Sequence, residues 1–386
     1  MIMKNQEIID DLATTRKIKK STKRRYQLVL NTYSEFHNMT LEELLDEADR
    51  EEEERVRRKK RKLKKRLTDF QTYVYNKYMR ATAKGYMDVV TMFYNHYELE
   101  LPNIPKVNNK NVIDNPPLKY SDLLTKEILK KVIDKSTPLL RAIILFSISS
   151  GCANAETMSL TIQSFIDATS NPTSPYHNSN NIYEVIDLLI DREDLVPTFH
   201  LKRRKTNKYY YTFCSPEATH AILVHLSNSK RKLVPEDKLF RIHPNALARL
   251  LAEMNDELGL GKKGTYNRLR THQFRKFHAS NLKKDGMNMD DINSIQGKGK
   301  STINEPYFFD SPEQLKETYM SHLSAITIDW NVHNLDMKSR EYHRLEQEFI
   351  LKDNEYNQLK NRVNEIEKAL SDTITDDDRS IMDKYI

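Results

Sequence analysis

The chain has 386 residues, which is long enough for roughly two or three domains, and 38% of them are hydrophobic, which is enough for buried cores. Its net charge of +7 and pI of about 9.0 favour an anionic partner, but they do not choose between nucleic acid and an acidic surface. No apolar stretch approaches the length that spans a bilayer and the first residues begin no signal peptide, so we expect a cytoplasmic protein without a membrane partner.

Helices are expected in a first domain at 20–105, after an N-terminal extension at 1–19. Apolar residues recur at helical spacing in 25–36 and again in 82–97, with aromatic residues placed among lysines and arginines. This pattern predicts a small helical domain.

A dense run of charge lies inside this domain. Four glutamates at 51–54 lead into 55–66, where ten of twelve residues are Lys or Arg. We expect one helix, acidic at its start and basic after it, as the helix dipole favours. The segment is either a solvated helix or a set of phosphate contacts along a DNA duplex. The candidate DNA contacts are Arg57, Arg58, Lys59, Lys60 and Lys62.

Several asparagines and a proline at 106–116, between prolines on either side, cannot continue a helix, so we expect a linker there and a second domain at 117–330. Ser121 precedes an amphipathic helix that should run to about Asp134, and Pro138 opens a strongly apolar helix that must be buried. The only cysteines, Cys152 and Cys214, lack metal-ligand spacing, so we expect buried thiols of a reducing compartment and no zinc.

A hairpin is predicted at 200–213, because β-forming residues flank a polar, basic centre that could lie in a groove. Ser215, Pro216 and Glu217 then suit a helix start, as cap, first helical residue and first-turn acid. Further along, 337–372 has apolar residues at alternating spacings of three and four, counted from Tyr342. This C-terminal helix is either a coiled coil or an amphipathic helix folded onto its own domain.

The candidate chemistry lies near the end of the second domain. His272 and Arg275 form a His-x-x-Arg pair, and Tyr307 follows in Glu-Pro-Tyr-Phe-Phe. Two basic groups can hold a phosphodiester and balance its developing charge, while a phenol attacks phosphorus. The pair alone is a weak signal, because it arises by chance in many chains. Tyr319 is the alternative tyrosine, although it also suits a packed aromatic.

Together these features resemble the tyrosine recombinases, or phage integrases, and in detail the integrases of archaeal proviruses and mobile elements, over about residues 20–330. The resemblance implies a mainly α fold with a small β-sheet. It implies a helical core-binding domain and a mixed α/β catalytic domain that clamp DNA, with the coiled-coil-like helix after them.

The resemblance also implies an activity, which is site-specific DNA cleavage and rejoining through a 3′-phosphotyrosine, without any cofactor. The implied partners are double-stranded DNA attachment sites, with four chains acting on two duplexes at the nucleoid. Tyr307 would be the nucleophile, and His272 with Arg275 would hold the phosphate. Lys205, or Lys202 as second choice, would protonate the leaving oxygen, and Lys298 would stand where the family usually has His or Trp. Additional DNA contacts are expected from Lys202, Arg203 and Arg204 at the hairpin tip.

One position departs from the family pattern. The first arginine of the family falls on Ala153, with Asn154 beside it, and neither residue can supply a guanidinium. Losing that group could cost on the order of 10²-fold in rate. Arg141, earlier on the apolar helix, is a poor substitute. Two rival hypotheses follow: a protein of this fold that binds its DNA site without cutting it, and an interaction protein dominated by its C-terminal helix.

Overall fold

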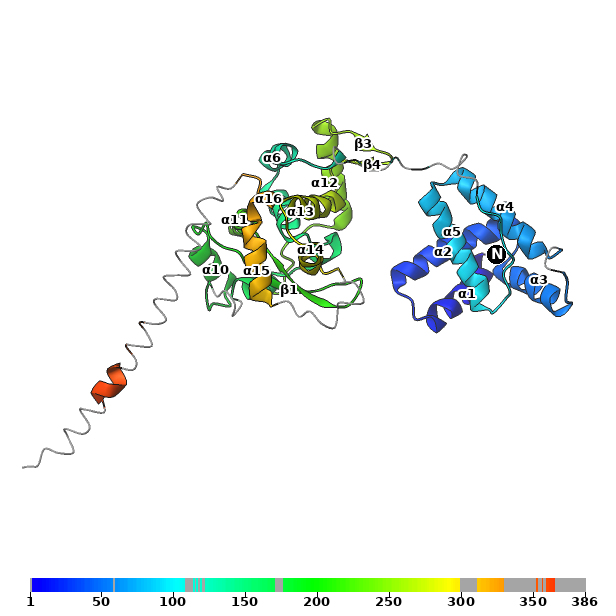
Figure 1. Cartoon of the computed structure of the whole chain (residues 1–386), viewed down its shortest axis with the longest axis horizontal. Helices are drawn as coiled ribbons and strands as arrows, with labels where there is room; N and C mark the ends of the chain where they lie inside the picture. The colour runs from blue at the N-terminus through cyan, green and yellow to red at the C-terminus, as the bar shows by residue number, and fades with distance from the viewer. Residues whose placement is uncertain are drawn as a thin grey trace, which may run out of the picture. The chain divides into compact units, whose positions relative to one another are not determined.

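The computed structural model describes residues 2–57, 60–107, 114, 116, 119, 122–170, 176–298, 311–329, 352, 356 and 359–364. The chain divides into two compact units, Met1–Pro117 and Leu118–Ile386, and each has its own hydrophobic core. The structure is mainly helical with two small antiparallel sheets, which confirms the predicted fold class (Figure 1). Within the described ranges, no helix is both long and apolar enough to cross a bilayer.

The first unit is built from helices around an aromatic core. Tyr33, Phe70 and Phe93 are fully buried, and the Tyr33 and Tyr94 hydroxyls lie 3.0 Å apart. The described helices are α1 (Ile2–Thr15), α2 (Lys20–His37), α3 (Leu41–Glu53), α4 (Lys62–Lys77) and α5 (Arg80–His96).

Helix α1 belongs to this core, although the sequence analysis placed 1–19 outside the helical domain. Ile9 and Leu12 lie one turn apart on α1 and are buried in the same cluster as Tyr33. Asn5 anchors the helix further, because its side-chain amide donates to the Ser34 hydroxyl at 2.9 Å. The helical unit therefore begins earlier than the sequence pattern indicated.

The prediction of one continuous helix through the charged run was wrong. Helix α3 ends at Glu53, and Arg55 takes a left-handed φ of 54° before α4 begins at Lys62. A continuous helix would stack like charges three and four residues apart, which is unfavourable. Instead, the Glu51 carboxylate accepts the Lys62 backbone N–H at 2.8 Å and caps α4. Arg61 lies 3.7 Å from carboxylate oxygens of both Glu52 and Glu100.

The second unit is organised around α7 (Pro138–Ser150). Thr137 caps this helix by accepting the Leu140 N–H, and from Leu140 to Ser150 only Arg141 is not fully buried. The predicted buried helix is confirmed. Around it lie α6 (Lys126–Asp134), α8 (Asn154–Thr157), α9 (Ile162–Thr169), α10 (Ile182–Leu189), α11 (Pro216–Ser227), α12 (Pro244–Glu257), α13 (Thr271–Lys284), α14 (Met289–Ile295), α15 (Pro312–Ser321) and α16 (Leu323–Ile326).

The predicted hairpin is also confirmed. Strand β1 (Thr198–Lys202) pairs antiparallel with β2 (Tyr209–Phe213), so that Lys202 faces Tyr209 at the turn end. A second, minimal pair joins β3 (Lys262–Lys263) to β4 (Tyr266–Asn267). Helix α11 starts as predicted, since the Ser215 hydroxyl accepts the Ala218 N–H and Pro216 is the first helical residue. Helix α6 begins later than predicted, because Thr125 caps it.

Two predicted features fall largely or wholly outside the described residues. Tyr307 is one of them. The other is the heptad pattern from Tyr342, of which the structure describes only a few helical residues. Among these, Tyr356, Leu359 and Val363 are exposed apolar side chains. The coiled coil at 337–372 therefore stays a prediction.

Candidate active site

The His-x-x-Arg pair lies in the first turns of α13. Arg270 is the N-cap residue and Thr271 the first helical residue, so His272 and Arg275 lie one turn apart on the same side of the helix. Their environments differ. Only 8% of Arg275 is exposed, whereas His272 keeps an exposed edge. The structure thus offers one buried guanidinium and one accessible imidazole.

Arg275 is held by the ends of two other helices. Its Nη1 donates to the Gly151 carbonyl at 2.6 Å, and its Nη2 donates to the Gln296 carbonyl at 2.7 Å. Gly151 caps the C-terminus of α7 and Gln296 caps that of α14. Carbonyls at helix C-termini lack partners within the helix and carry the negative end of its dipole, so they suit a cation. The Gln296 side chain donates back to the Arg275 carbonyl at 3.1 Å, which locks the pair.

Glycines allow these two turns to pack closely. Gly151 and Gly297 have φ of 60° and 62°. A Cβ added to Gly151 would lie 2.6 Å from the His278 ring, and one added to Gly297 would lie 2.7 Å from the Tyr210 ring. After α14, the Gly297 N–H bonds to the Ser294 carbonyl and the Lys298 N–H to the Asn293 carbonyl, at 2.9 and 2.8 Å. This helix-ending motif fixes the backbone position from which the Lys298 side chain extends.

A second guanidinium reaches the same carbonyl from the hairpin. Arg203 follows β1 directly, and its Nη1 donates to the Gln296 carbonyl at 2.8 Å. Both Arg203 and Arg275 therefore bond one oxygen, although they come from different parts of the chain. The Nε of Arg203 is buried and has no partner among the described residues.

The charges around this point are mostly of one sign. Burial and then Arg203 lower the pKa of Arg275. Partial desolvation, followed by Arg275 and Arg203, lowers the pKa of Lys298. Partial desolvation also lowers the pKa of His272, and the nearby cations lower it further. Arg275 and the four other cations near it or His272 together form what we call the cationic cluster: Arg203, Arg270, Arg275, Lys276 and Lys298.

One carboxylate lies beside the cationic cluster. Glu156 on α8 is buried, and its Oε1 accepts the backbone N–H of Arg204 at 3.1 Å. Its Oε2 has no hydrogen-bond partner within the described part of the chain. One carboxylate cannot balance five cations. Two unit charges about 5 Å apart repel by roughly 3 kcal/mol at an effective dielectric constant near 20. A bound anion would relieve that repulsion.

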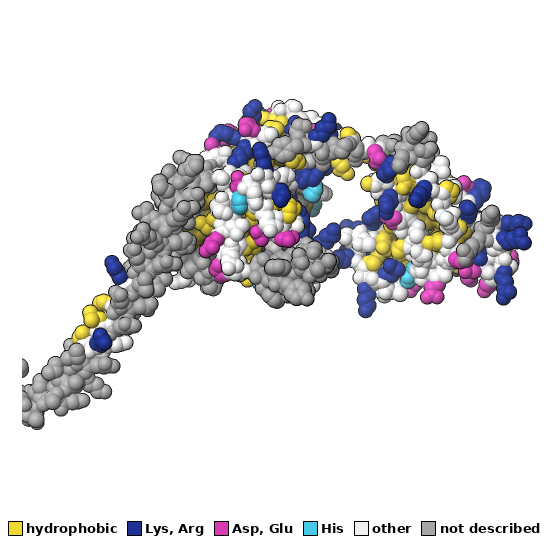
Figure 2. All heavy atoms as spheres, in the orientation of Figure 1, with side chains coloured by type: hydrophobic (Ala, Val, Ile, Leu, Met, Phe, Trp, Pro, Cys, Tyr) yellow, Lys and Arg dark blue, Asp and Glu magenta, His cyan; other side chains and the backbone are white. Residues whose placement is uncertain are grey.

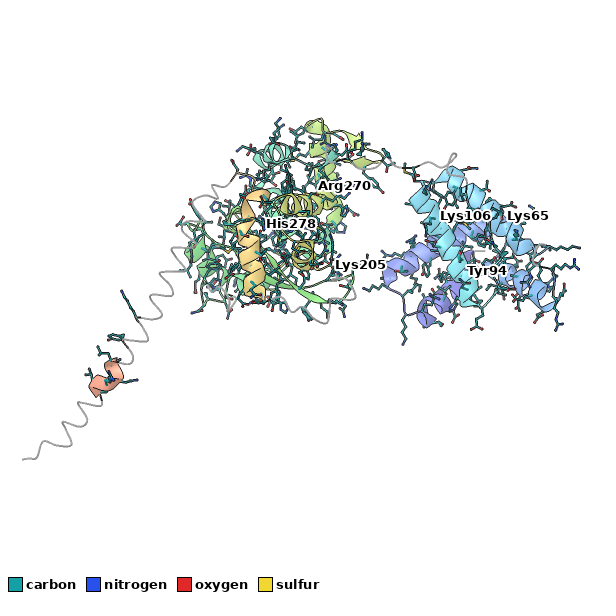
Figure 3. All side chains as sticks on the ribbon, in the orientation of Figure 1. Lys65, Tyr94, Lys106, Lys205, Arg270 and His278 are labelled. Carbon is teal, nitrogen blue, oxygen red and sulfur yellow. The ribbon has the colours of Figure 1, made fainter. Side chains whose placement is uncertain are left out.

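The other predicted site residues lie on the hairpin and at the start of α8. Lys205 is exposed in the turn between β1 and β2, at the hairpin tip (Figure 3). Lys202 places its ammonium 5.1 Å from the centre of the Tyr209 ring, and the Arg204 side chain is exposed. Ala153 is the N-cap residue of α8 and Asn154 its first residue, directly after the Gly151 turn.

Tyr319 is a packed aromatic residue. Its side chain is fully buried, and its hydroxyl donates to the Ser149 carbonyl at 3.1 Å. Burial raises the pKa of this phenol well above its ordinary value. A phenol enclosed in this way cannot reach a phosphodiester. Cys152 and Cys214 are likewise buried free thiols, as predicted.

In the first unit, the predicted DNA contacts that the structure describes are either exposed or paired with an acid. Arg57 and Lys60 are exposed, whereas the Lys62 ammonium lies 3.2 Å from the Glu47 carboxylate. Arg66 bonds the same carboxylate and lowers the pKa of Glu47. Arg58 and Lys59 lie outside the described residues. Part of the basic run therefore neutralises acids of its own unit.

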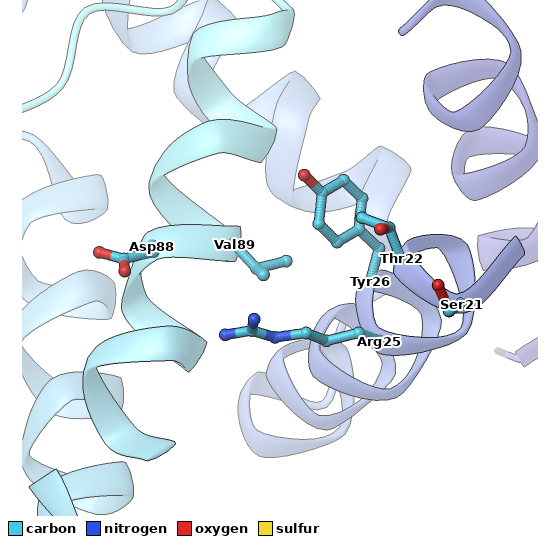
Figure 4. Close-up of a pocket in the computed structure, with 6 residues that line it drawn as sticks. All are labelled: Ser21, Thr22, Arg25, Tyr26, Asp88 and Val89. Atoms are coloured by element: carbon cyan, nitrogen blue, oxygen red, sulfur yellow. The ribbon is translucent and has the colours of Figure 1, made fainter. Parts of the chain in front are cut away.

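A basic surface at the start of α2 was not predicted from the sequence. Lys20, Lys23 and Arg24 line one hollow between α1 and α2. Arg25 extends from α2 toward α5, where a Cβ on Gly85 would lie 2.1 Å from its guanidinium (Figure 4). A second hollow lies between α2 and α5 and is lined by Ser21, Thr22, Arg25, Tyr26, Asp88 and Val89. Lys and Arg side chains are scattered over the visible surface of both units (Figure 2). The signal for this basic surface in the sequence is the density of Lys and Arg along 16–25.

Comparison with known proteins gives similarity at the level of solved structures. No family model and no curated protein matches the chain. Solved structures that are similar to it include recombinases and integrases. The crystal structure of XerA recombinase is 15% identical, covers 83% of this chain and 99% of its own, and has a TM-score of 0.34. The Tn1549 transposon integrase in complex with a circular intermediate DNA is 12% identical, with coverages of 82% and 98% and a TM-score of 0.48. XerH site-specific recombinase bound to difH substrate is 16% identical, with coverages of 66% and 69% and a TM-score of 0.42.

Proposed function

We propose that this chain is a site-specific DNA recombinase, an integrase of a mobile element or provirus, that cleaves and rejoins strands through Tyr307. The observation that carries the proposal is the cationic cluster around Arg275, next to an accessible His272. A buried guanidinium surrounded by further guanidinium and ammonium groups, with one carboxylate beside them, suits a phosphodiester, which brings the missing negative charge. The partner is double-stranded DNA, and four chains would act on two duplexes.

In the proposed reaction, the Tyr307 oxygen attacks the scissile phosphorus and forms a 3′-phosphotyrosine, while the bond to the 5′ oxygen breaks. The phenol proton passes to His272, whose lowered pKa keeps the imidazole neutral at neutral pH and able to accept it. Lys205 supplies a proton to the departing 5′ oxygen. Arg275 and Lys298 balance the charge on the non-bridging oxygens. A 5′ hydroxyl of the partner strand reverses these steps, so no cofactor is needed.

The test is covalent capture of DNA. The full chain is incubated with sheared genomic DNA of its source cell, denatured in detergent, and the attached DNA is sequenced. A nicked duplex carrying the recovered site then gives a gel assay. We expect a protein-DNA band that survives denaturation and disappears in Tyr307→Phe. Tyr319→Phe is the matched control, because that phenol is buried, and it should keep the band.

A second function is favoured by one observation, the absence of an arginine at Ala153 and Asn154. In that case the chain binds its site without cutting it. The same assay separates the two functions. A retained gel shift with no covalent band for the unmodified chain would contradict the recombinase proposal and support the DNA-binding one.

A further inference from the structure

We propose that Arg203, at the end of strand β1, is a catalytic residue that clamps the scissile phosphate together with Arg275, in the role for which position 153 has no arginine. This inference rests on the proposed function, because it concerns the same phosphate site. In the sequence, Arg203 is one of several basic residues near the hairpin tip, whereas in the structure its contacts differ from those of its neighbours Lys202 and Arg204.

Arg203 and Arg275 converge on one acceptor. Arg203 Nη1 and Arg275 Nη2 bond the Gln296 carbonyl at 2.8 and 2.7 Å. The two nitrogens therefore lie no further apart than these two bonds laid end to end. A pair of guanidinium groups at that separation can bond two non-bridging oxygens of one phosphate, which is the geometry that a bidentate clamp requires.

Backbone hydrogen bonds fix the position from which the Arg203 side chain extends. Its N–H donates to the Lys208 carbonyl at 2.8 Å, and its carbonyl accepts the Asn207 N–H at 2.7 Å. Asn207 takes a left-handed φ of 61° in this turn. The next peptide N–H, that of Arg204, is held by Glu156 at 3.1 Å. Because the turn is bonded on both sides, the Arg203 side chain leaves from a defined point and needs little ordering when DNA binds.

The Arg203 guanidinium has a donor that makes no hydrogen bond within the described part of the chain. Arg203 Nε is buried without a partner among the described residues, and its Nη1 bonds a carbonyl rather than a carboxylate. A buried donor without a partner is unfavourable unless something supplies an acceptor. The groups around the two guanidiniums include Lys298, His272, the Cys152 thiol, the Tyr210 phenol and the Glu156 carboxylate, which already accepts the Arg204 N–H. A phosphate oxygen would supply both the acceptor and the missing negative charge.

The chemical role follows from the proposed reaction. As the Tyr307 oxygen bonds to phosphorus and the 5′ oxygen departs, negative charge grows on the two non-bridging oxygens. Arg203 and Arg275 donate hydrogen bonds to these oxygens and transfer no proton. Lys205, the proposed acid, lies two residues further along the same turn. The hairpin would then bring one half of the phosphate clamp and the proton donor to the site together.

The first experiment measures the rate of the Tyr307-dependent covalent band in Arg203→Ala and Arg203→Lys. We expect a loss of about 10²-fold or more in Arg203→Ala, and a smaller loss in Arg203→Lys, which keeps the charge but not the fork. Arg249→Ala is the control, since Arg249 is an exposed residue of α12 paired with Glu253, and it should keep the rate. An unchanged rate in Arg203→Ala would overturn the inference, whereas no band in the unmodified chain would overturn the proposed function instead.

The second experiment separates charge stabilisation from a structural effect. A methylphosphonate at the mapped scissile position removes one charged oxygen, so the reaction needs less cationic help. We expect the defect of Arg203→Ala to shrink at least tenfold on this substrate. An equal defect on both substrates would mean that Arg203 only shapes the hairpin. Ala153→Arg combined with Arg203→Ala gives a further check, because an arginine entering beside the Gly151 turn should recover cleavage that the single variant has lost.

Discussion

At the scale of single residues, a buried histidine links the candidate site to acid stability. The pKa of His278 is lowered to about 4, chiefly by burial and to a smaller extent by the nearby Arg275 and Lys298. Its Nδ1 pairs with the Ile148 carbonyl at 2.9 Å, while its Nε2 is buried without a partner in the described ranges. An unfolded histidine has a pKa near 6.5, so the unfolded chain takes up a proton that the folded chain refuses.

The contribution of His278 to stability is therefore complete above about pH 6.5 and is lost as the pH falls toward 4. When the pH falls from 7.5 to 5, we expect the loss of this contribution to lower the free energy of unfolding by about 2 kcal/mol. Denaturant titrations of the unmodified chain and of His278→Gln at both pH values measure it. The drop in the variant should be smaller by that amount, because the other titrating groups are common to both proteins. Equal drops would contradict the assignment.

Among the residues of the candidate site, only those with a local sequence signal could be predicted. His272 and Arg275 were found because their spacing is local and has a chemical meaning of its own. Arg203 could be named only as one basic residue among several. Its bond to the Gln296 carbonyl joins positions 93 apart, and no local pattern predicts such a contact. Gln296 itself gave no signal, because it contributes a backbone oxygen.

At the scale of elements, the turn that ends α7 supports the site. Gly151 has a φ of 60°, and an added Cβ would lie 2.6 Å from the His278 ring. We expect Gly151→Ala to lower the free energy of unfolding by roughly 2–4 kcal/mol, since the left-handed backbone and the clash add. The variant should also bind DNA more weakly, because the Gly151 carbonyl holds Arg275. Chemical denaturation and a gel shift measure the two effects.

Gly259, at the end of α12, is the matched control. It has the same φ of 60°, but nothing lies within 4 Å of an added Cβ. Gly259→Ala should therefore lose only about 1–2 kcal/mol, which is the cost of the left-handed backbone alone. If both variants lost the same stability, close packing of the turn against His278 would play no part.

Elements were predictable where their signals are local. Thr137 with Pro138 starts α7, and Ser215 with Pro216 starts α11, so caps and apolar patterns were sufficient. The break between α3 and α4 was missed for the opposite reason. It depends on Glu51 capping Lys62 and on Arg61 lying between Glu52 and Glu100, which are contacts across the folded unit. Charge pattern alone favoured one helix.

At the scale of the whole molecule, the two units have separate cores, so each should unfold as its own cooperative transition. Phe93 is fully buried in the first core and Ile144 in the second. Phe93→Leu and Ile144→Val each remove a little packing and should lose about 1 kcal/mol. We expect Phe93→Leu to shift the midpoint of one thermal transition only, by roughly 4–8 °C for a unit of about 100 residues.

Ile144→Val should shift the other transition, and by less, roughly 2–4 °C, because the larger unit has the greater entropy of unfolding. Calorimetry of the intact chain resolves both, and each variant is the control for the other. Addition of the DNA site identified by covalent capture should raise both transitions if both units contact that DNA, since any ligand stabilises the state that binds it. A single transition whose midpoint moves in either variant would mean that the two units unfold together. If added DNA raised only the transition of the second unit, the basic surface of α2 would have no role in binding.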